Sequence, residues 1–255
     1  MRAASRALAI LKALADSVDG DRSLDEISTI VGLPKSTTHR LLETLKAQGW
    51  VDNGDAAGSY RLGLEAAMIG SRAIQAQRPR AEVREVISRA AHEIGETIGL
   101  GVLEGHLVLV VEKGVPDRPF SWNLGVGSTM PAHATAAGKV LLSGLADADV
   151  EVRLRESGLT LSGPKTITEL PALLEQLGGV RQRGYAIDDE EFEEGLRCVA
   201  VPVFAPDGHV VHSLGITAPV SRVTHARLRE LASFLKELAD EVDRYLTLER
   251  AAAAL

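Results

Sequence analysis

The sequence predicts an α+β protein with an N-terminal winged helix-turn-helix domain, a linker helix and a larger domain built on an antiparallel sheet. Three observations lead to this prediction. The chain has 255 residues, which is too long for one small module. Two short helical patterns separated by a glycine stand near its start, and strand pairs mix with helical patterns in the remainder. We expect the domains at 1–63 and 80–255, with the linker helix at 64–79.

The composition is that of an ordinary soluble protein, with 45% hydrophobic and 25% charged residues, and it excludes general disorder. The longest apolar run, residues 107–111, is far shorter than the roughly 20 residues of a bilayer-spanning helix, so we expect no membrane partner. The N-terminus lacks the pattern of a secretory signal, and the single cysteine, Cys198, has no partner for an internal disulfide. We therefore expect a cytoplasmic protein.

The net charge of −7 is distributed unevenly along the chain. Residues 1–63 carry eight basic and eight acidic side chains, so the whole acidic excess lies in the rest of the chain. An acidic surface repels a polyanion, but a neutral segment binds nucleic acid when its basic side chains share one face.

Local signals place three helices in the first 50 residues. Apolar residues at helical spacing predict the first over 5–15. Ser23, followed three residues later by a glutamate, forms a capping box that starts the second helix, and Gly32 ends it. Pro34 suits the first position of the third helix, where its missing N–H costs nothing. Helix, tight turn and helix form the unit that places its second helix in the major groove of DNA.

The third helix has one apolar and one polar face. Its buried side is predicted from helical spacing to carry Thr38, Leu41, Leu42 and Leu45. Arginine reads guanine through two hydrogen bonds, and short polar residues near a helix start meet phosphates. We expect the polar face to contact DNA through Lys35, Ser36, Thr37, His39 and Arg40.

Residues 50–62 predict two short strands around a turn of small and polar residues. A hairpin in this place makes the helix-turn-helix winged, and we expect Arg61 to touch the backbone of the adjacent groove. For an isolated helix, a polar face that merely meets solvent would be the simpler interpretation. The hairpin favours DNA binding instead.

The rest of the chain predicts a linker helix and then an antiparallel sheet with helices. Helical spacing recurs from 64 to 77 until Pro79 interrupts it. The second domain is expected to contain helices at 83–94, 134–144, 147–157 and 168–182, hairpins at 98–111 and 197–217, and a long C-terminal helix from Thr224.

The second hairpin can be placed in register from its turn. Residues 205–208 have proline and glycine where a tight turn favours them, so counting outward places Cys198 opposite Gly215. Thr217 falls on the same face two residues further on. One face of the sheet is therefore predicted to carry a thiol, a glycine that leaves space for lack of a side chain, and a hydroxyl group.

Several blocks of the sequence resemble the IclR family of bacterial transcriptional regulators, namely residues 6–11, 32–42, 60–63, 130–139, 183–191 and 195–203. The resemblance covers almost the whole chain. It implies a double-stranded DNA operator as partner and a GAF-like effector-binding domain. It also implies a homodimer formed by the winged domain and the linker region, with further assembly to a homotetramer as in family members.

The resemblance further implies an effector pocket lined by Asp188, Cys198, Gly215 and Thr217. The block at 130–139 matches the helix whose N-terminal turn closes that pocket. Free N–H groups at a helix start attract carboxylates, so a small organic acid is the expected effector. We expect its anion to be held at Thr135, Ala136 and Ala137.

One departure from the family pattern bears on the choice of acid. Many relatives have serines at the positions of Gly215 and Thr217, and glycine at that of Ala218. The pocket is therefore less polar, which favours a bulkier or aromatic acid over a glyoxylate-type effector. Replacing Gly215 by Phe is expected to abolish the effector response and leave DNA binding intact.

An enzyme is the alternative class of protein. Cys198, His133 and Asp188 are the residue types of a thiol nucleophile with its base and its orienting acid. A cysteine within a strand of valines and alanines is usually a buried apolar residue, and nothing in the sequence supplies an activating neighbour. We therefore favour a regulator of operator binding that needs no cofactor.

No metal site is expected either. His209 and His212 are three residues apart on a predicted strand and so point to opposite faces. The acidic run at 188–194 is interpreted as a solvated loop and helix start.

Overall fold

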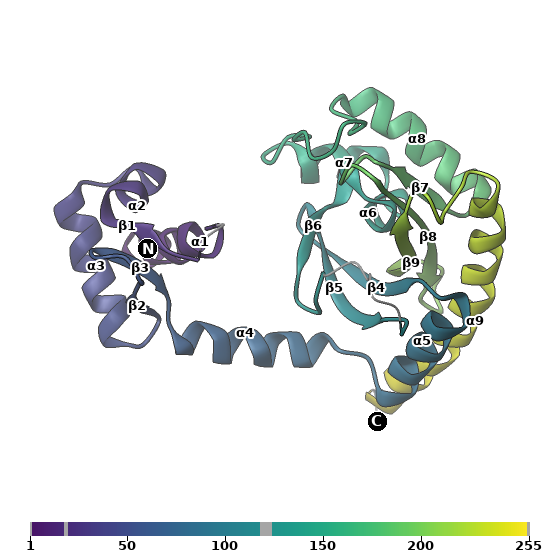
Figure 1. Ribbon diagram of the computed structural model, residues 1–255, viewed down its shortest axis with the longest axis horizontal. Coiled ribbons are helices and arrows are strands. Elements are labelled where there is room, and N and C mark those ends of the chain that lie inside the picture. The colour runs from purple at the N-terminus through teal and green to yellow at the C-terminus, as the bar shows by residue number, and fades with distance from the viewer. Residues whose placement is uncertain (1, 18–19, 118–123, 254–255) are drawn as a thin grey trace. The chain divides into compact units, whose positions relative to one another are not determined.

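The computed structural model describes residues 2–17, 20–117 and 124–253. The chain forms two compact units, Met1–Ala76 and Gln77–Leu255 (Figure 1). Within the described ranges, every helix is too short or too polar to span a bilayer.

The first unit is a winged helix-turn-helix, as predicted. Its elements are α1 Arg2–Ala15, β1 Arg22–Ser23, α2 Leu24–Val31, α3 Lys35–Ala47, β2 Val51–Asn53, β3 Ser59–Leu62 and α4 Leu64–Gln77. The helices α1, α2 and α3 and the strand β2 pack around buried apolar side chains, chiefly Ile10, Leu14, Ile27, Leu42 and Val51. The wing is an antiparallel sheet in the order β1-β3-β2.

Local interactions set the two ends of α2 and the start of α3. Ser23 caps α2: the backbone N–H of Glu26 donates to Ser23 Oγ at 3.3 Å, and that of Ser23 donates to Glu26 Oε2 at 2.8 Å. Gly32 ends α2 with a φ of 64°, in the left-handed region that favours glycine. Pro34 precedes the first helical residue of α3 instead of occupying that position, because its ψ of 141° is extended. The prediction was therefore wrong by one residue.

The second unit is an antiparallel sheet in the order β6-β5-β4-β9-β8-β7, with helices on both faces. Its strands are β4 Thr97–Glu104, β5 Leu107–Gly114, β6 Thr129–Pro131, β7 Ala186–Asp189, β8 Leu196–Phe204 and β9 Val210–Pro219. Its helices are α5 Ala81–Ile94, α6 Ala136–Ser143, α7 Asp147–Leu154, α8 Leu170–Arg183 and α9 Arg227–Ala253, with a short 3-10 turn at Ala132–Ala134. This arrangement confirms the predicted α+β class.

The two faces of this sheet are packed differently. Along one face, α5 and α9 lie side by side and share a large core with the strands, which includes Ile87, Ile98, Val199 and Leu235 (Figure 1). The other face is covered by α6, behind which α7 and α8 pack. The start of α6 therefore lies over the strands.

The predicted register of the second hairpin was wrong by two residues. Cys198 pairs with Thr217, and Gly215 pairs with Ala200. One residue of the shift comes from the turn, where the N–H of Ala205 donates to the carbonyl of His209, and the other from a bulge beside Val203. Because the shift is even, the predicted set of residues still shares one face.

Replacing Ser23 by Ala tests the capping box. The backbone N–H of Glu26 loses its acceptor at the start of α2, whereas the N–H of Ser23 keeps the Glu26 carboxylate, so the free energy of unfolding of the first unit should fall by about 1 kcal/mol. Urea titration of the intact protein, followed by a signal from the first unit, measures the change. Thr29→Ala in the same helix is the control and should stay within about 0.5 kcal/mol of wild type. Equal effects of the two substitutions would contradict the capping role.

Candidate functional site

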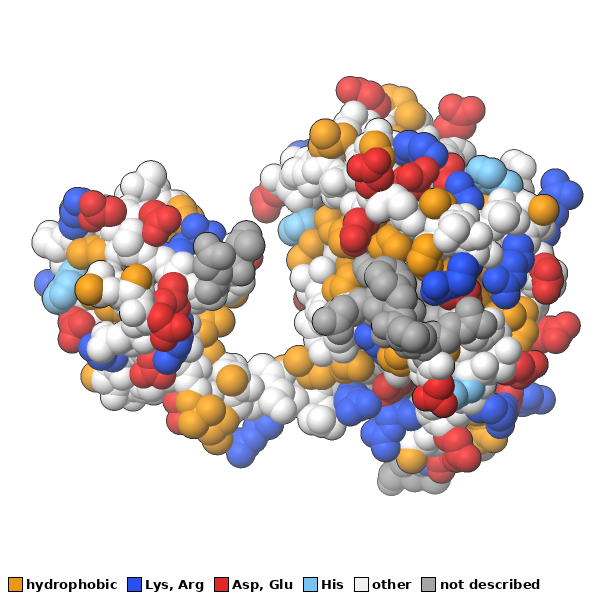
Figure 2. Space-filling view, viewed as in Figure 1, with side chains coloured by type: hydrophobic (Ala, Val, Ile, Leu, Met, Phe, Trp, Pro, Cys, Tyr) orange, Lys and Arg blue, Asp and Glu red, His pale blue; other side chains and the backbone are white. Residues whose placement is uncertain are grey.

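The polar face of α3 is open to solvent. Ser36, His39 and Arg40 are exposed, whereas Thr38 and Leu42 are fully buried beneath them. Thr37 lies between these two groups and is partly exposed. Figure 2 shows charged and polar side chains, a histidine among them, over the outer side of this helix. The amphipathic pattern of α3 is thus the one that the sequence predicts.

The two remaining residues expected to touch DNA are engaged in ion pairs within the unit. Lys35 Nζ lies 2.7 Å from an Asp25 carboxylate oxygen, and Arg61 Nη1 lies 2.9 Å from Asp55 Oδ1. Both pairs are exposed, and exposed pairs contribute little stability. Lys35 and Arg61 can therefore leave their carboxylate partners and bind DNA phosphates with little loss of free energy.

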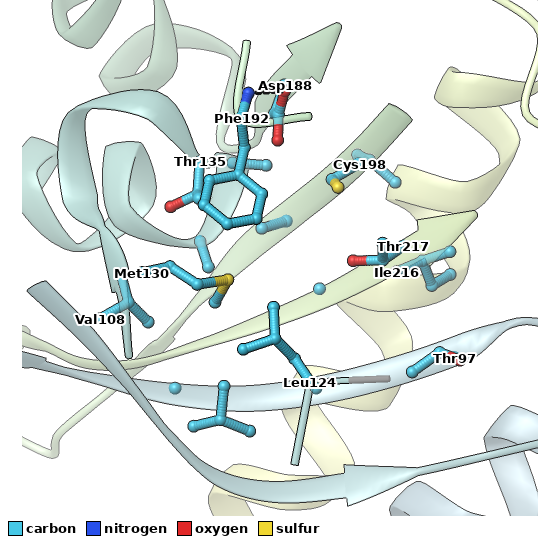
Figure 3. Close-up of a pocket in the computed structure, with 18 of the residues that line it drawn as sticks. Thr97, Val108, Leu124, Met130, Thr135, Asp188, Phe192, Cys198, Ile216 and Thr217 are labelled. Carbon is cyan, nitrogen blue, oxygen red and sulfur yellow. Dashed lines mark hydrogen bonds between the residues drawn. The ribbon is translucent and has the colours of Figure 1, made fainter. Parts of the chain in front are cut away.

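A cavity lies between α6 and the sheet, and two rows of cross-strand neighbours form its floor (Figure 3). The first row is polar and consists of Asp188, Cys198, Thr217 and Thr97. The second row is made of alanines and glycines and ends on a lysine. It consists of Ala186, Ala200, Gly215, Gly99 and Lys113. All but Ala186 line the cavity, and the empty space among the lining residues, counted together with the open solvent at the mouth, is about 600 Å³.

The rest of the wall is largely apolar. Leu124, Met130 and Phe192 line the cavity together with Val108 and Val110. In Figure 3, Asp188, Phe192 and Thr135 lie together at one end, and Leu124 and Thr97 lie at the other. An apolar cavity with a few polar groups at its ends suits a small organic molecule.

The start of α6 supplies backbone donors to this cavity. Thr135 is the N-cap residue, and its Oγ1 accepts from the N–H of Gly138 at 3.1 Å. Ala136 and Ala137 are the first two helical residues, so their N–H groups have no intrahelical acceptor. Thr135, Ala136 and Ala137 all line the cavity. All seven predicted effector residues thus come together around one space, and their binding of an effector stays a prediction.

Asp188 is buried at the polar end of the floor, where it is 1% exposed. Burial raises its pKa to about 6, although backbone N–H groups donate to the carboxylate. These donors are Glu191, at 2.8 Å from Oδ1, and Phe192, at 3.3 Å. The same hydrogen bonds hold the loop that brings Phe192 to the cavity.

The acidic run at 188–194 is only in part the solvated loop that was predicted, with Glu193 and Glu194 exposed, and it starts no helix. It ends β7 and continues as a loop without a helix. Glu191 is 5% exposed and pairs at 2.5 Å with the Nζ of Lys139, which has no exposed surface. The prediction failed because spacing along the chain does not reveal a buried cation on α6.

The structure does not bring the three residues of the enzyme alternative together. His133 Nε2 donates to Thr160 O at 3.0 Å, and His133 does not line the cavity. Burial, and then the charge of Asp188, raise the pKa of the Cys198 thiol well above its usual value. A nucleophilic cysteine needs the opposite shift. Among the described residues, no group of histidines, cysteines and carboxylates could hold a metal ion.

Lys113, Gly99 and Phe192 also line the cavity, and the sequence analysis missed them. Strict alternation along β5 from Val108 and Val110 would place residue 112 on the cavity face. A bulge changes this, because Gly101 pairs with Val110 whereas Gly99 pairs with Lys113. The short apolar run at 107–111 gave no signal of that extra residue.

Gly99 is a better position than Gly215 for filling the cavity. A Cβ added at Gly215 would lie 3.2 Å from Ala200 Cβ and 3.3 Å from Val199 O, so its neighbours would have to move. A Cβ added at Gly99 meets no atom within 4 Å. The predicted Gly215→Phe test is therefore replaced by substitutions at Gly99.

A helix-turn-helix with an open polar helix, joined to a domain that encloses a small-molecule cavity, defines the class of ligand-responsive transcription regulators. The chain matches two protein-family profiles. Residues 3–54 match the IclR helix-turn-helix domain, and residues 72–244 match the bacterial transcriptional regulator IclR C-terminal domain. The chain belongs to the IclR family, as the sequence blocks predicted.

Similar proteins span nearly the same length. The HTH-type transcriptional regulator XynR of Escherichia coli is 34% identical, over 93% of this chain and 93% of its own. The transcriptional repressor IclR of the same organism is 33% identical, over 93% of this chain and 87% of its own. The protein is therefore a DNA-binding transcription regulator with an effector-binding domain, and not an enzyme.

The solved structures that resemble the second unit include one with a bound aromatic acid. It is the inducer-binding domain of the transcription factor PobR from Acinetobacter, a double mutant in complex with 3-hydroxybenzoic acid. It is 30% identical, covers 63% of this chain and 94% of its own, and gives a TM-score of 0.59.

The buried Asp188 predicts a specific pH dependence of stability. The folded protein holds the proton up to about pH 6, whereas the unfolded chain releases it near pH 3.9, so this group's contribution falls as pH rises through that window. Asp188→Asn stays neutral throughout. It should match wild type at about pH 4 and gain up to about 3 kcal/mol relative to it by pH 7. Urea titrations at several pH values measure the difference, and a pH-independent difference would contradict the assignment.

Proposed function

We propose that the protein binds its operator through the polar face of α3 and that a small aromatic acid in the cavity changes its operator affinity. Arg40 reads a base edge, Ser36, Thr37 and His39 contact the groove and backbone near the start of α3, and Lys35 and Arg61 meet phosphates. The effector shifts the protein between two arrangements by its difference in affinity for them.

The observation that carries this proposal is the cavity with an apolar wall and helix donors at one end. An aromatic ring fits over Gly99 and Gly215, where no side chain fills the floor. The carboxylate is held by the N–H groups of Ala136 and Ala137, with Thr135 beside them. Asp188 lies at the same end; burial raises its pKa to about 6, and an anion bound beside it would raise that pKa further, towards the protonated form.

Two further observations support the choice of ligand and the assembly. The PobR relative, solved with 3-hydroxybenzoic acid, supports an aromatic acid over glyoxylate. A homodimer, assembling to a tetramer, is supported by α4, in which Leu64, Met68 and Ile69 are exposed apolar side chains. Binding to an operator places the regulator in the cytoplasm.

Arg40→Ala tests the reading of DNA. Loss of two hydrogen bonds to a base should cost about 1–3 kcal/mol of discrimination at one base pair. Gel-shift titrations at fixed salt, against single-base variants of the promoter fragment that the protein prefers, measure it. Arg61→Ala is the control and should weaken binding to all variants alike, as a phosphate contact does. An unchanged base preference of Arg40→Ala would contradict its role.

A panel of acids tests the cavity. Benzoate, 3-hydroxybenzoate and glyoxylate are titrated against the complex with operator DNA, and the aromatic acids should change operator affinity at lower concentrations. Gly99→Leu fills the floor and should raise the concentration for half-response at least about tenfold, since overfilled space excludes the ring. Gly99→Ala, the matched control, should respond more like wild type. A normal dose–response in Gly99→Leu would contradict the cavity assignment.

A further inference from the structure

Arg78, the first residue after α4, forms a half-buried ion pair within the second unit. Its neighbour Pro79 is buried. Arg78 Nη2 lies 2.7 Å from Glu112 Oε2 on β5, and Arg78 Nε lies 3.2 Å from the same oxygen. Glu112 is 5% exposed, so this carboxylate depends on its partners in the protein.

The second oxygen of Glu112 is bound to the cavity strand. Glu112 Oε1 accepts from the backbone N–H of Lys113 at 3.0 Å. The bulge at Val111 places the side chain of Lys113 on the cavity face and that of Glu112 on the opposite face. Lys113 Nζ in turn donates to Leu124 O at 2.9 Å, and Leu124 also lines the cavity.

One carboxylate of the second unit therefore binds both the first residue after α4 and a strand that lines the cavity. A ligand that moves Lys113 or Leu124 acts on the backbone N–H that Glu112 holds. If Lys113 moved alone, Glu112 would lose a hydrogen bond while buried, and the loss of a partner by a buried charge is strongly unfavourable. Arg78 and Lys113 are thus held to each other through Glu112.

We propose that Glu112 is a positioning residue that couples occupancy of the effector cavity to the start of the second unit at Arg78, and through Arg78 to α4. This inference rests on the proposed function, because it assigns the route by which an effector alters operator affinity. A ligand displaces Lys113 at the end of the cavity opposite α6. Glu112, which binds both Lys113 and Arg78, passes this displacement on to Arg78.

The chain offers a matched control pair. Glu96 is 1% exposed and binds Arg222, whose Nη2 lies 2.8 Å from Glu96 Oε2. It also precedes a residue of the cavity floor, Thr97, as Glu112 precedes Lys113. Arg222, however, follows β9 and lies far along the chain from α4. Glu96→Gln therefore removes an equally buried carboxylate without touching the junction.

The experiment measures operator affinity of the full-length protein in two arms. The first arm adds saturating benzoate or 3-hydroxybenzoate, and the second fills the cavity by Gly99→Leu without ligand. Each arm is run on wild type, Glu112→Gln, Arg78→Ala and Glu96→Gln, and the double variant Arg78→Ala with Glu112→Gln completes a cycle. We expect a change of at least fivefold in operator Kd in wild type and in Glu96→Gln, and less than twofold in Glu112→Gln. Direct titration should show that Glu112→Gln still binds the acid within about threefold of wild type.

The outcomes separate the two claims. If the double variant is no more impaired than either single one, Arg78 and Glu112 act as one unit, as proposed. If Glu112→Gln responds like wild type, or if Glu96→Gln loses the response equally, the coupling role is overturned while the effector cavity stands. If neither acid alters operator affinity in wild type, the proposed function fails. The coupling role is overturned too if, in addition, Gly99→Leu on its own has the same operator Kd as wild type.

Discussion

The absence of side-chain bulk along one cross-strand row is the constraint on which the effector domain depends. Ala186, Ala200, Gly215 and Gly99 lie side by side on four neighbouring strands, and α6 packs over the same face. Larger side chains in this row would close the space between helix and sheet. The row keeps the floor open, while the large core on the other face, under α5 and α9, stabilises the sheet. A cavity and a stable fold thus occupy opposite faces of one sheet.

The first unit is the DNA-binding domain and the second unit is the effector-binding domain. The polar side of α3 is free because its apolar side is fully engaged with α1, α2 and the wing. In the proposed mechanism, the cavity selects its ligand by shape at the floor and by charge at the N-terminus of α6 and at Lys113, which both line it. A ligand alters DNA binding only to the extent that it binds one arrangement more tightly than another. A buried polar contact such as that of Glu112 makes such arrangements discrete, since it is either formed or lost.

Local signals in the sequence predicted most of the fold. The capping box at Ser23 and the left-handed Gly32 are short-range features, and both are present in the structure. Helical spacing in α3 separated Thr38 and Leu42 from the polar face for the same reason. The features that the sequence predicted wrongly depend on residues far apart in the chain. Two irregularities shifted the partner of Cys198 from Gly215 to Thr217, and a bulge exchanged Glu112 for Lys113 on the cavity face. The burial of Glu191 depends on Lys139, which is 52 residues away in the sequence.

The most direct test of the central claim is a crystal structure of the intact protein grown with saturating benzoate. The account predicts density for the ring over Gly99 and Gly215, with the carboxylate at the N–H groups of Ala136 and Ala137. Benzoate bound elsewhere, or a floor closed by the protein's own side chains, would contradict it.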